Sequence, residues 1–334
     1  MNFLTMKTFF CALFILLGLG SQSLFAQPGD RFPYVEQPPM VVGGENEMEW
    51  MTLHFWDNYD FSRAKEFYSS QVRHEGFAVF VQTLYYNPFE VAIEALDDML
   101  NKAAATEEGY WDVLEVAENV LYDPMSPIRN DTLWEQVLFH AISSKSPLDE
   151  ASKVRYLALH KLVSRNQAGR PSSDFVYTLA NGKRARMHDI KSPYTLLYFY
   201  NPGCSSCAYA REQLLASGYI DELHRRGLIK VLALYPDGDV AEWRKNLSEN
   251  PSWWITSYDD GMVINNKELY DLKAIPTFYL LDQEKNVILK DPSVEMLIEQ
   301  LAYLFEMQAA SIHKKPCSEK EQGFLCIELL LCRN

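Results

Sequence analysis

Two cysteines three positions apart, Cys204 and Cys207, are the residues whose type and spacing point most directly to chemistry. They lie in the stretch Asn-Pro-Gly-Cys-Ser-Ser-Cys-Ala, which begins at Asn201. Cysteines at this spacing can form a redox couple that exchanges disulfides, one half of a zinc site, or a structural disulfide. The residues around the pair decide which of these three kinds of site is present.

The elements predicted on either side of the pair favour redox chemistry. An apolar run at residues 194–200 predicts a buried strand, and residues 208–217 predict a helix. Cys204 would then lie at the start of the helix, where unpaired backbone N–H groups and the helix dipole stabilise a thiolate. Cys207 follows one turn later on nearly the same face, so it can close a disulfide and release whatever is bound to Cys204.

The alternatives find less support. A zinc site needs two further ligands, whereas Cys317, Cys326 and Cys332 are spread through the C-terminal tail and His313 stands alone. We therefore expect no metal. A peroxiredoxin needs a threonine three residues before its cysteine, and Asn201 occupies that position. Because the tail cysteines are odd in number, at least one should be free or bonded to another molecule; a loose local disulfide is a simpler interpretation than a catalytic relay.

A proline supplies the second motif. Pro276, in Lys-Ala-Ile-Pro-Thr-Phe-Tyr-Leu-Leu, opens a predicted strand about 70 residues after the cysteine pair. Proline makes a cis peptide bond accessible. At the edge of a strand, where the strand begins, it also leaves the preceding backbone unpaired by the sheet and free to hold an extended peptide.

Strands and helices alternate around the two motifs, which predicts an α/β sheet from residue 174 to residue 307. Asn181-Gly182 is a strong hairpin-turn signal between the first two strands. The predicted strands are residues 174–179, 184–187, 194–200, 228–235, 277–281 and 287–290, and the predicted helices are residues 208–217, 240–247 and 294–307.

This order of elements, with CxxC before a helix and Ile-Pro-Thr before two closing strands, resembles the thioredoxin fold. The stretch LANGKRARMHDIKSP also resembles the front hairpin of exported thioredoxin-like proteins of cytochrome maturation and disulfide reduction. The resemblance implies that Cys204 attacks, that Cys207 resolves, and that the two form a redox-active disulfide. It makes Pro276 a cis-proline facing them and Ile275 the residue whose backbone binds substrate. Such thiolate exchange requires no bound cofactor.

Two positions depart from the family pattern. Thioredoxin has a buried aspartate six residues before its first cysteine, where this sequence has Tyr198. Cytochrome-maturation relatives often have a glutamate three residues after the second cysteine, where this sequence has Ala210. Glu212 and Asp239 are candidate replacements, but the sequence does not show that either reaches the sulfurs, so it assigns no proton carrier.

The N-terminus predicts export. Residues 1–26 carry one charge, Lys7, followed by an apolar stretch that is too short to span a bilayer. We expect a secretory signal cleaved after Ala26, with cleavage after Ser23 or an uncleaved anchor as alternatives. The expected location is the periplasm, where disulfides persist unless electrons are delivered. The expected partners are protein thiols and disulfides and a membrane or periplasmic electron donor.

Length and composition predict two domains with substantial cores. The chain has 334 residues, of which 48% are hydrophobic and 13% aromatic. Its formal net charge is −14, and removal of the segment that carries Lys7 makes it −15. An acidic chain without basic runs is a poor candidate for binding nucleic acid or anionic membranes.

The region before the sheet predicts an all-α domain. Residues 27–46 are rich in proline, glycine and polar residues and predict an extended leader; residues 47–165 show helical periodicity; residues 166–173 form a polar linker; residues 308–334 form the cysteine-containing tail. The helical region resembles uncharacterised regions that precede thioredoxin-like domains in exported bacterial proteins, and this brings no activity with it. We expect its aromatic residues to be core rather than a binding groove, namely Trp50, Trp56, Trp111, Trp134, Tyr85 and Tyr86.

Two functional hypotheses follow. The first is an exported thiol–disulfide oxidoreductase that exchanges disulfides with protein clients through Cys204 and Cys207. The alternative is a non-catalytic protein-interaction module that uses a thioredoxin fold as a scaffold.

Overall fold

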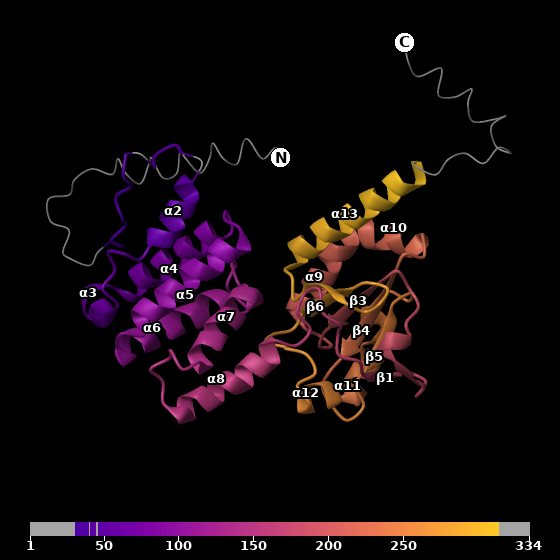
Figure 1. The fold of residues 1–334 in the computed structure, drawn as a ribbon. Coiled ribbons are helices and arrows are strands. Elements are labelled where there is room, and N and C mark those ends of the chain that lie inside the picture. The colour runs from indigo at the N-terminus through magenta and orange to yellow at the C-terminus, as the bar shows by residue number, and fades with distance from the viewer. Residues whose placement is uncertain (1–30, 40, 45, 314–334) are drawn as a thin grey trace, which may run out of the picture. The chain divides into compact units, whose positions relative to one another are not determined.

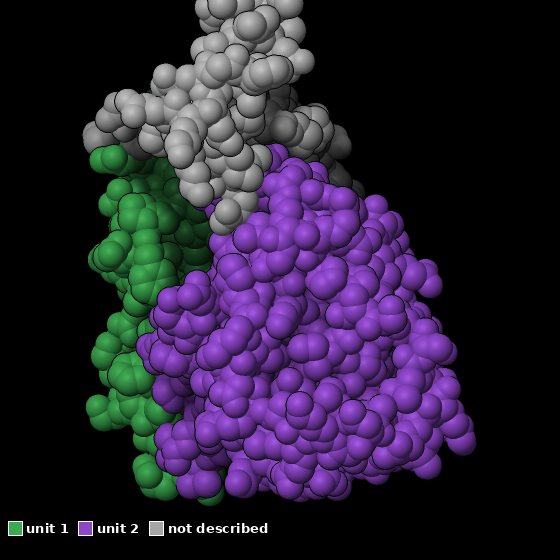
Figure 2. Space-filling model, turned by 90° about the vertical axis from the view of Figure 1, so that its right-hand side faces the viewer, with its two compact units in different colours: residues 1–153 green, residues 154–334 purple. Residues whose placement is uncertain are grey.

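The computed structural model describes residues 31–39, 41–44 and 46–313. The chain divides into two compact units, residues 1–153 and residues 154–334 (Figure 2). The predicted signal segment and the tail cysteines Cys317, Cys326 and Cys332 lie outside the described residues. Over the described residues, no helix is both long enough and apolar enough to cross a membrane.

The first unit is helical, as predicted (Figure 1). Its α-helices are α2 (Glu47–His54), α3 (Ala64–Phe67), α4 (Ser70–Leu84), α5 (Phe89–Ala103), α6 (Glu107–Ala117) and α7 (Asp131–Ile142), and α8 (Glu150–Val163) continues into the second unit. A 3₁₀ turn, η1 (Phe61–Arg63), precedes α3, and a π-helical turn, η2 (Glu118–Tyr122), follows α6. Polar side chains cap several of these helices; the side chain of Ser69, for example, accepts a hydrogen bond from the backbone N–H of Val72.

Apolar side chains of these helices form the core of the unit. Trp56 and Trp134 are buried, as expected. The same expectation was wrong for Tyr85 and Tyr86, which are 55% and 46% exposed. Both residues follow the last turn of α4, where the chain leaves the helix before α5 begins, so helical spacing no longer decides which way they face.

The segment predicted as a linker lies along the start of β7 (Val287–Lys290) and the turn that precedes it. The backbone N–H of Gly169 donates to the carbonyl of Val287 at 2.8 Å. The N–H of Ser172 donates to the carbonyl of Lys285 at 2.9 Å. These hydrogen bonds hold residues 169–172 against the sheet.

The second unit contains one seven-stranded mixed sheet. Its strands are β1 (Val176–Leu179), β2 (Arg184–Arg186), β3 (Tyr194–Phe199), β4 (Ile229–Tyr235), β5 (Ile255–Tyr258), β6 (Thr277–Leu281) and β7 (Val287–Lys290), in the order β2-β1-β5-β4-β3-β6-β7. Strands β3, β4 and β5 are parallel, whereas β6 pairs antiparallel with β3. This mixed α/β sheet is the predicted fold class.

Both faces of the sheet are covered, because the central strand β3 is buried on each side. Leu196, Tyr198 and Tyr200 belong to one hydrophobic cluster, and Leu197 and Phe199 belong to the other. Helices α9 (Ser205–Ala216), α10 (Tyr219–Arg225) and α13 (Val294–His313) lie together on the first side (Figure 1). The remaining helices are α11 (Val240–Lys245) and α12 (Val263–Asn266), and two 3₁₀ turns, η3 (Met187–Asp189) and η4 (Leu247–Glu249), complete the unit.

Candidate functional site

The cysteine pair lies just after the end of the buried strand β3. After β3 ends at Phe199, the chain turns through Gly203, whose φ of 69° lies in the region that favours glycine. Helix α9 then begins with Cys204 as its N-cap residue. The Sγ atom of Cys204 accepts a hydrogen bond from the backbone N–H of Cys207 at 3.2 Å. The first sulfur therefore occupies the position that a capping side-chain oxygen takes in other helices.

The two cysteines form a disulfide, and their environments differ. The Cα atoms of Cys204 and Cys207 are 5.2 Å apart, within the usual range for a disulfide. Cys207 is only 1% exposed, packed among the apolar residues beneath α9. Cys204 is partly exposed. An external sulfur can therefore reach Cys204 far more easily than Cys207.

Strand pairing places Pro276 next to the pair. In the antiparallel register of β3 and β6, Phe199 lies opposite Thr277, so the residue before Thr277 lies beside the end of β3. The Ile275–Pro276 peptide bond is cis. Cys204, Cys207, Ile275 and Pro276, the four residues that the sequence singled out, thus lie where β3 ends and β6 begins.

Ser206 connects the two motifs. Its hydroxyl donates to the carbonyl oxygen of Ile275 at 3.4 Å and lies 3.2 Å from Sγ of Cys204. The sequence assigned no role to Ser206. Its contact with Ile275 depends on the folding of β6 against β3, which no local pattern shows.

Two buried tyrosines lie under the pair. Tyr198 donates its hydroxyl hydrogen to the carbonyl oxygen of Cys207 at 2.8 Å, and burial raises the pKa of Tyr198. Trp243 donates its indole N–H to the hydroxyl of Tyr200 at 3.1 Å. Burial raises the pKa of Tyr200 to about 12. Both hydroxyls therefore keep their protons at neutral pH.

One carboxylate, Glu249, contacts the loop that carries Cys204. Its Oε1 atom accepts a hydrogen bond from the backbone N–H of Gly203 at 3.1 Å. Its Oε2 atom lies 3.8 Å from Nη1 of Arg211, which follows Cys207 by one turn of α9. The side chains of Glu249 and Arg211 are 25% and 10% exposed. No sequence signal indicated this contact, because Glu249 lies far along the chain in the turn η4.

Glu212 and Asp239, which the sequence offered as proton carriers, lie elsewhere. Glu212 is exposed on α9. Asp239 caps α11, where its Oδ1 atom accepts a hydrogen bond from the backbone N–H of Glu242 at 2.9 Å. Neither shows a contact with the cysteine pair.

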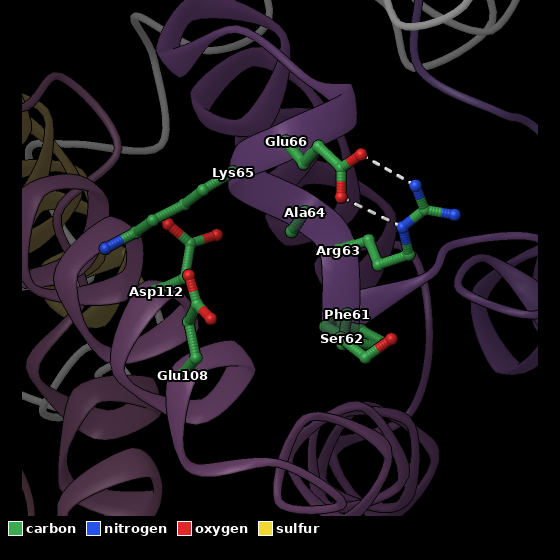
Figure 3. A pocket seen from close by; sticks show the side chains of 8 residues that line it. All are labelled: Phe61, Ser62, Arg63, Ala64, Lys65, Glu66, Glu108 and Asp112. Carbon is green, nitrogen blue, oxygen red and sulfur yellow. Dashed lines mark hydrogen bonds and ion pairs between the residues drawn. The ribbon is translucent and has the colours of Figure 1, made fainter.

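The two pockets described here are separate from this site. One, about 70 Å³ in volume, lies in the helical unit, with Arg63 bonded to Glu66 on one side and Lys65, Glu108 and Asp112 on the other (Figure 3). The second, about 330 Å³ in volume, is lined mostly by residues that precede β3, among them His188 and Lys191, together with Gly227 and Gln283. The cysteine pair follows the opposite end of that strand. In the part of the chain that the structure describes, no group of three or more His, Cys, Asp or Glu side chains is placed to hold a metal ion.

Comparison with known proteins agrees with this architecture. A crystal structure of a thioredoxin-like protein from Bacteroides caccae is 33% identical in sequence and superimposes with a TM-score of 0.77. The alignment covers 81% of this chain and 98% of that one. This chain belongs to the thioredoxin-like proteins. A family model described as a domain of unknown function, DUF5106, matches residues 17–166, which include the helical region.

Other solved structures match a smaller share of this thioredoxin-like protein. The C-terminal domain of an uncharacterized protein from Bacteroides fragilis is 42% identical, with 41% of this chain and 98% of that chain covered and a TM-score of 0.40. The thioredoxin domain of a thiol-disulfide oxidoreductase from Bacteroides vulgatus is 20% identical, with 42% and 98% covered and a TM-score of 0.37. No curated protein matches the chain.

Proposed function

We propose that this protein is an exported thiol–disulfide oxidoreductase that exchanges disulfides with protein clients through Cys204 and Cys207. The observation that carries the proposal is the unequal exposure of the two sulfurs at the start of α9. Cys204 is partly exposed at the helix N-cap, whereas Cys207 is 1% exposed. Such a difference separates an attacking thiol from a resolving thiol.

The chemistry needs two displacement steps. In the reduced protein, the Cys204 thiolate attacks one sulfur of a client disulfide, forming a mixed disulfide and releasing the other client sulfur as a thiolate. Cys207 then loses its proton and attacks Sγ of Cys204. The internal disulfide forms, and the second client sulfur leaves as a thiolate, so two electrons pass from the protein to the client. Run in reverse, the same steps oxidise a client dithiol.

Several groups around Cys204 suit the first step. The N–H of Cys207 points at its sulfur, and the hydroxyl of Ser206 lies 3.2 Å away. Both can donate hydrogen bonds to a thiolate, and the N-terminus of α9 favours negative charge at this position. A client backbone next to the reacting sulfur would lie against Ile275 and Pro276, in the segment directly before β6.

The proposal places the protein in the periplasm. Its support is the sequence of residues 1–26, which has the composition of a secretory signal. In an oxidising compartment a reducing couple needs a supply of electrons, so we further propose a membrane or periplasmic electron donor as a partner. Separation of periplasm and cytoplasm, with immunodetection of the mature chain, tests the location; retention of the full-length chain in the cytoplasm would contradict it.

A trapping experiment tests the proposed chemistry. Cys207→Ser should stall the reaction at the mixed disulfide, so discrete high-mass adducts should appear without reductant and collapse on reduction. Cys204→Ser should trap far less, because the remaining thiol is buried. The wild-type protein, reduced with a mild thiol, should reduce insulin disulfides.

Mass spectrometry of the adducts would identify the clients and the electron donor. If neither variant traps a partner and the wild-type protein does not reduce insulin, the disulfide is structural. The thioredoxin fold would then serve as an interaction module.

A further inference from the structure

The position that holds the buried acid in thioredoxin holds a residue that cannot replace it here. Tyr198 is fully buried, and its hydroxyl donates to the carbonyl of Cys207. Because burial raises its pKa, Tyr198 does not give up its proton at neutral pH. The resolving step still requires removal of the thiol proton from Cys207, whose sulfur is shielded from solvent.

Glu249 has the geometry for this task. One carboxylate oxygen is fixed by the N–H of Gly203, directly before the attacking cysteine. The other lies 3.8 Å from the guanidinium of Arg211, directly after the helical turn that contains the resolving cysteine. Glu249 therefore lies beside two residues that flank the CxxC segment in the sequence. With a quarter of its side chain exposed, it can also exchange protons with solvent.

The surroundings of this carboxylate are polar although largely buried. Four titratable groups lie near one another here: Glu249 from η4, Arg211 from α9, Tyr198 from β3, and Tyr200, which directly follows β3. Two further polar atoms in the same region, Nη1 of Arg211 and Oδ1 of Asn201, are buried without a hydrogen-bond partner among the described residues. Buried polar atoms of this kind are commonly bridged by water, which also conducts protons.

We infer that Glu249 accepts the thiol proton of Cys207 during resolution of the mixed disulfide. This inference rests on the proposed oxidoreductase function. In the balanced step, the Cys207 thiol gives up its proton, which water passes to the Glu249 carboxylate, and the Cys207 sulfur bonds to Cys204. The bond between Cys204 and the client breaks, and the client leaves as a thiolate. Glu249 then returns the proton to that thiolate or to solvent. Arg211 acts as a positioning residue that directs the second carboxylate oxygen towards α9.

A purely electrostatic role for Glu249 predicts the opposite sign. If Glu249 only neutralised Arg211, removing its charge would leave an uncompensated cation near Cys207 and would favour the thiolate. Resolution would then become faster at neutral pH. If Glu249 accepts the proton, its loss makes resolution slower.

Single-turnover kinetics separate the two roles. The full mature chain, with Cys317, Cys326 and Cys332 changed to serine, is reduced and mixed with one equivalent of an aromatic disulfide whose thiolate absorbs visible light. The first thiolate released reports attack by Cys204, and the second reports resolution by Cys207. Rates are measured between pH 6 and pH 9.5 for wild type, Glu249→Gln, Glu249→Asp and the matched control Glu212→Gln.

We expect Glu249→Gln to slow the second phase at least about tenfold at pH 7, in line with the loss of a general base, while the first phase changes by less than about twofold. The second-phase rates of wild type and variant should converge at alkaline pH, where hydroxide removes the proton. Glu249→Asp should recover part of the rate, and Glu212→Gln should behave as wild type. An unchanged or faster second phase in Glu249→Gln overturns the inference. Absence of both phases in the wild-type protein would instead overturn the proposed function.

Discussion

Each unit of the protein contains a largely buried arginine–carboxylate pair, and the two pairs differ in how they are held. In the helical unit, Arg73 of α4 hydrogen-bonds directly to Asp112 of α6, whose side chain is only 3% exposed. In the α/β unit, Arg211 and Glu249 are 3.8 Å apart, and the carboxylate is 25% exposed. The first pair joins two packed helices, whereas the second lies beside the loop that carries Cys204.

The comparison shows how the same residue types can serve stability in one place and chemistry in another. A buried carboxylate with a direct guanidinium partner is held charged, because separating the pair would leave an uncompensated charge in the core. A looser carboxylate that reaches solvent can take part in proton transfer, as inferred for Glu249. We therefore expect changes to the helical pair to alter stability and changes to the Glu249 pair to alter disulfide exchange.

The largest expected effect is on the helical pair. Asp112→Ala should destabilise the protein by about 3–5 kcal/mol, because Arg73 keeps a buried charge without its partner. Urea unfolding followed by far-ultraviolet circular dichroism measures the change. Insulin reduction per folded molecule should stay at the wild-type value. Glu66→Ala, which removes an exposed partner of Arg63, is the control and should leave the unfolding midpoint unchanged. Equal midpoints for both variants would show that the Arg73 pair has no special structural role.

A smaller stability effect is expected from the α/β pair. Arg211→Met keeps most of the packed stem but removes the guanidinium, and Glu249 can remain hydrated because it is partly exposed. We expect a loss of about 1 kcal/mol in the free energy of unfolding, because only a loose, partly exposed ion pair is removed. The same variant should slow resolution by Cys207, because the carboxylate is no longer directed towards α9. Unaltered resolution in a folded Arg211→Met protein would remove Arg211 from the proposed positioning role.

The sequence predicted the cysteine pair, the proline and most of the sheet because each has a local signal. The strand that precedes Cys204 is a continuous apolar run, and Asn181-Gly182 marks the first hairpin. Strand β5 was missed. It has four residues, two of them only partly buried, and it becomes a strand by pairing with β4 on one side and β1 on the other. Such pairing depends on tertiary structure rather than on local propensity.

The candidate site divides in the same way. Cys204, Cys207 and Pro276 could be named from motifs, whereas Ser206 and Glu249 gain their contacts only through the fold. Glu249 reaches Gly203 because β4 lies parallel to β3 and the chain returns through η4 beside the end of β3. A lone glutamate in a polar turn carries no signal of that approach. Glu212 and Asp239 were considered as proton carriers because they are acidic residues of the same domain. Residue type does not show how far a side chain lies from the sulfurs.

Removing one buried tyrosine hydroxyl from each unit tests whether the helical unit affects stability and the α/β unit affects disulfide exchange. Tyr110→Phe removes the partner of the buried Nδ1 atom of His140, 2.7 Å away, and should cost about 1–2 kcal/mol in stability with no effect on exchange. Tyr198→Phe removes a hydrogen bond to the carbonyl of Cys207, which can still accept within α9. Its stability cost should be about 0.5–1 kcal/mol, with slower resolution as the main result. Chemical unfolding and the two-phase thiolate assay distinguish the variants; the reverse ranking in either measurement would contradict the division of roles.

The smallest effect expected concerns pH, and it tests whether the helical unit responds to protons through His140. This side chain is buried, with Nδ1 beside the Tyr110 hydroxyl and Nε2 3.3 Å from the Oδ1 atom of Asn101. A neutral imidazole satisfies both contacts, with Nε2–H donating to Asn101 and Nδ1 accepting from Tyr110. Burial lowers the pKa of His140, opposed by nearby Asp97 and assisted by Lys145.

The direction of the pH effect follows from that shift. Because the pKa of His140 is lower in the folded state, the unfolded chain binds more protons once the pH falls below about 6.5. The contribution of this residue to stability should be complete above that pH and decline below it, by at most about 1.4 kcal/mol per pH unit for one proton. Unfolding free energies of wild type and His140→Gln, measured from pH 7.5 to pH 5, isolate this contribution as the difference between the two curves. We expect the wild type to lose more stability than the variant on acidification; parallel curves would mean that His140 does not titrate in this range.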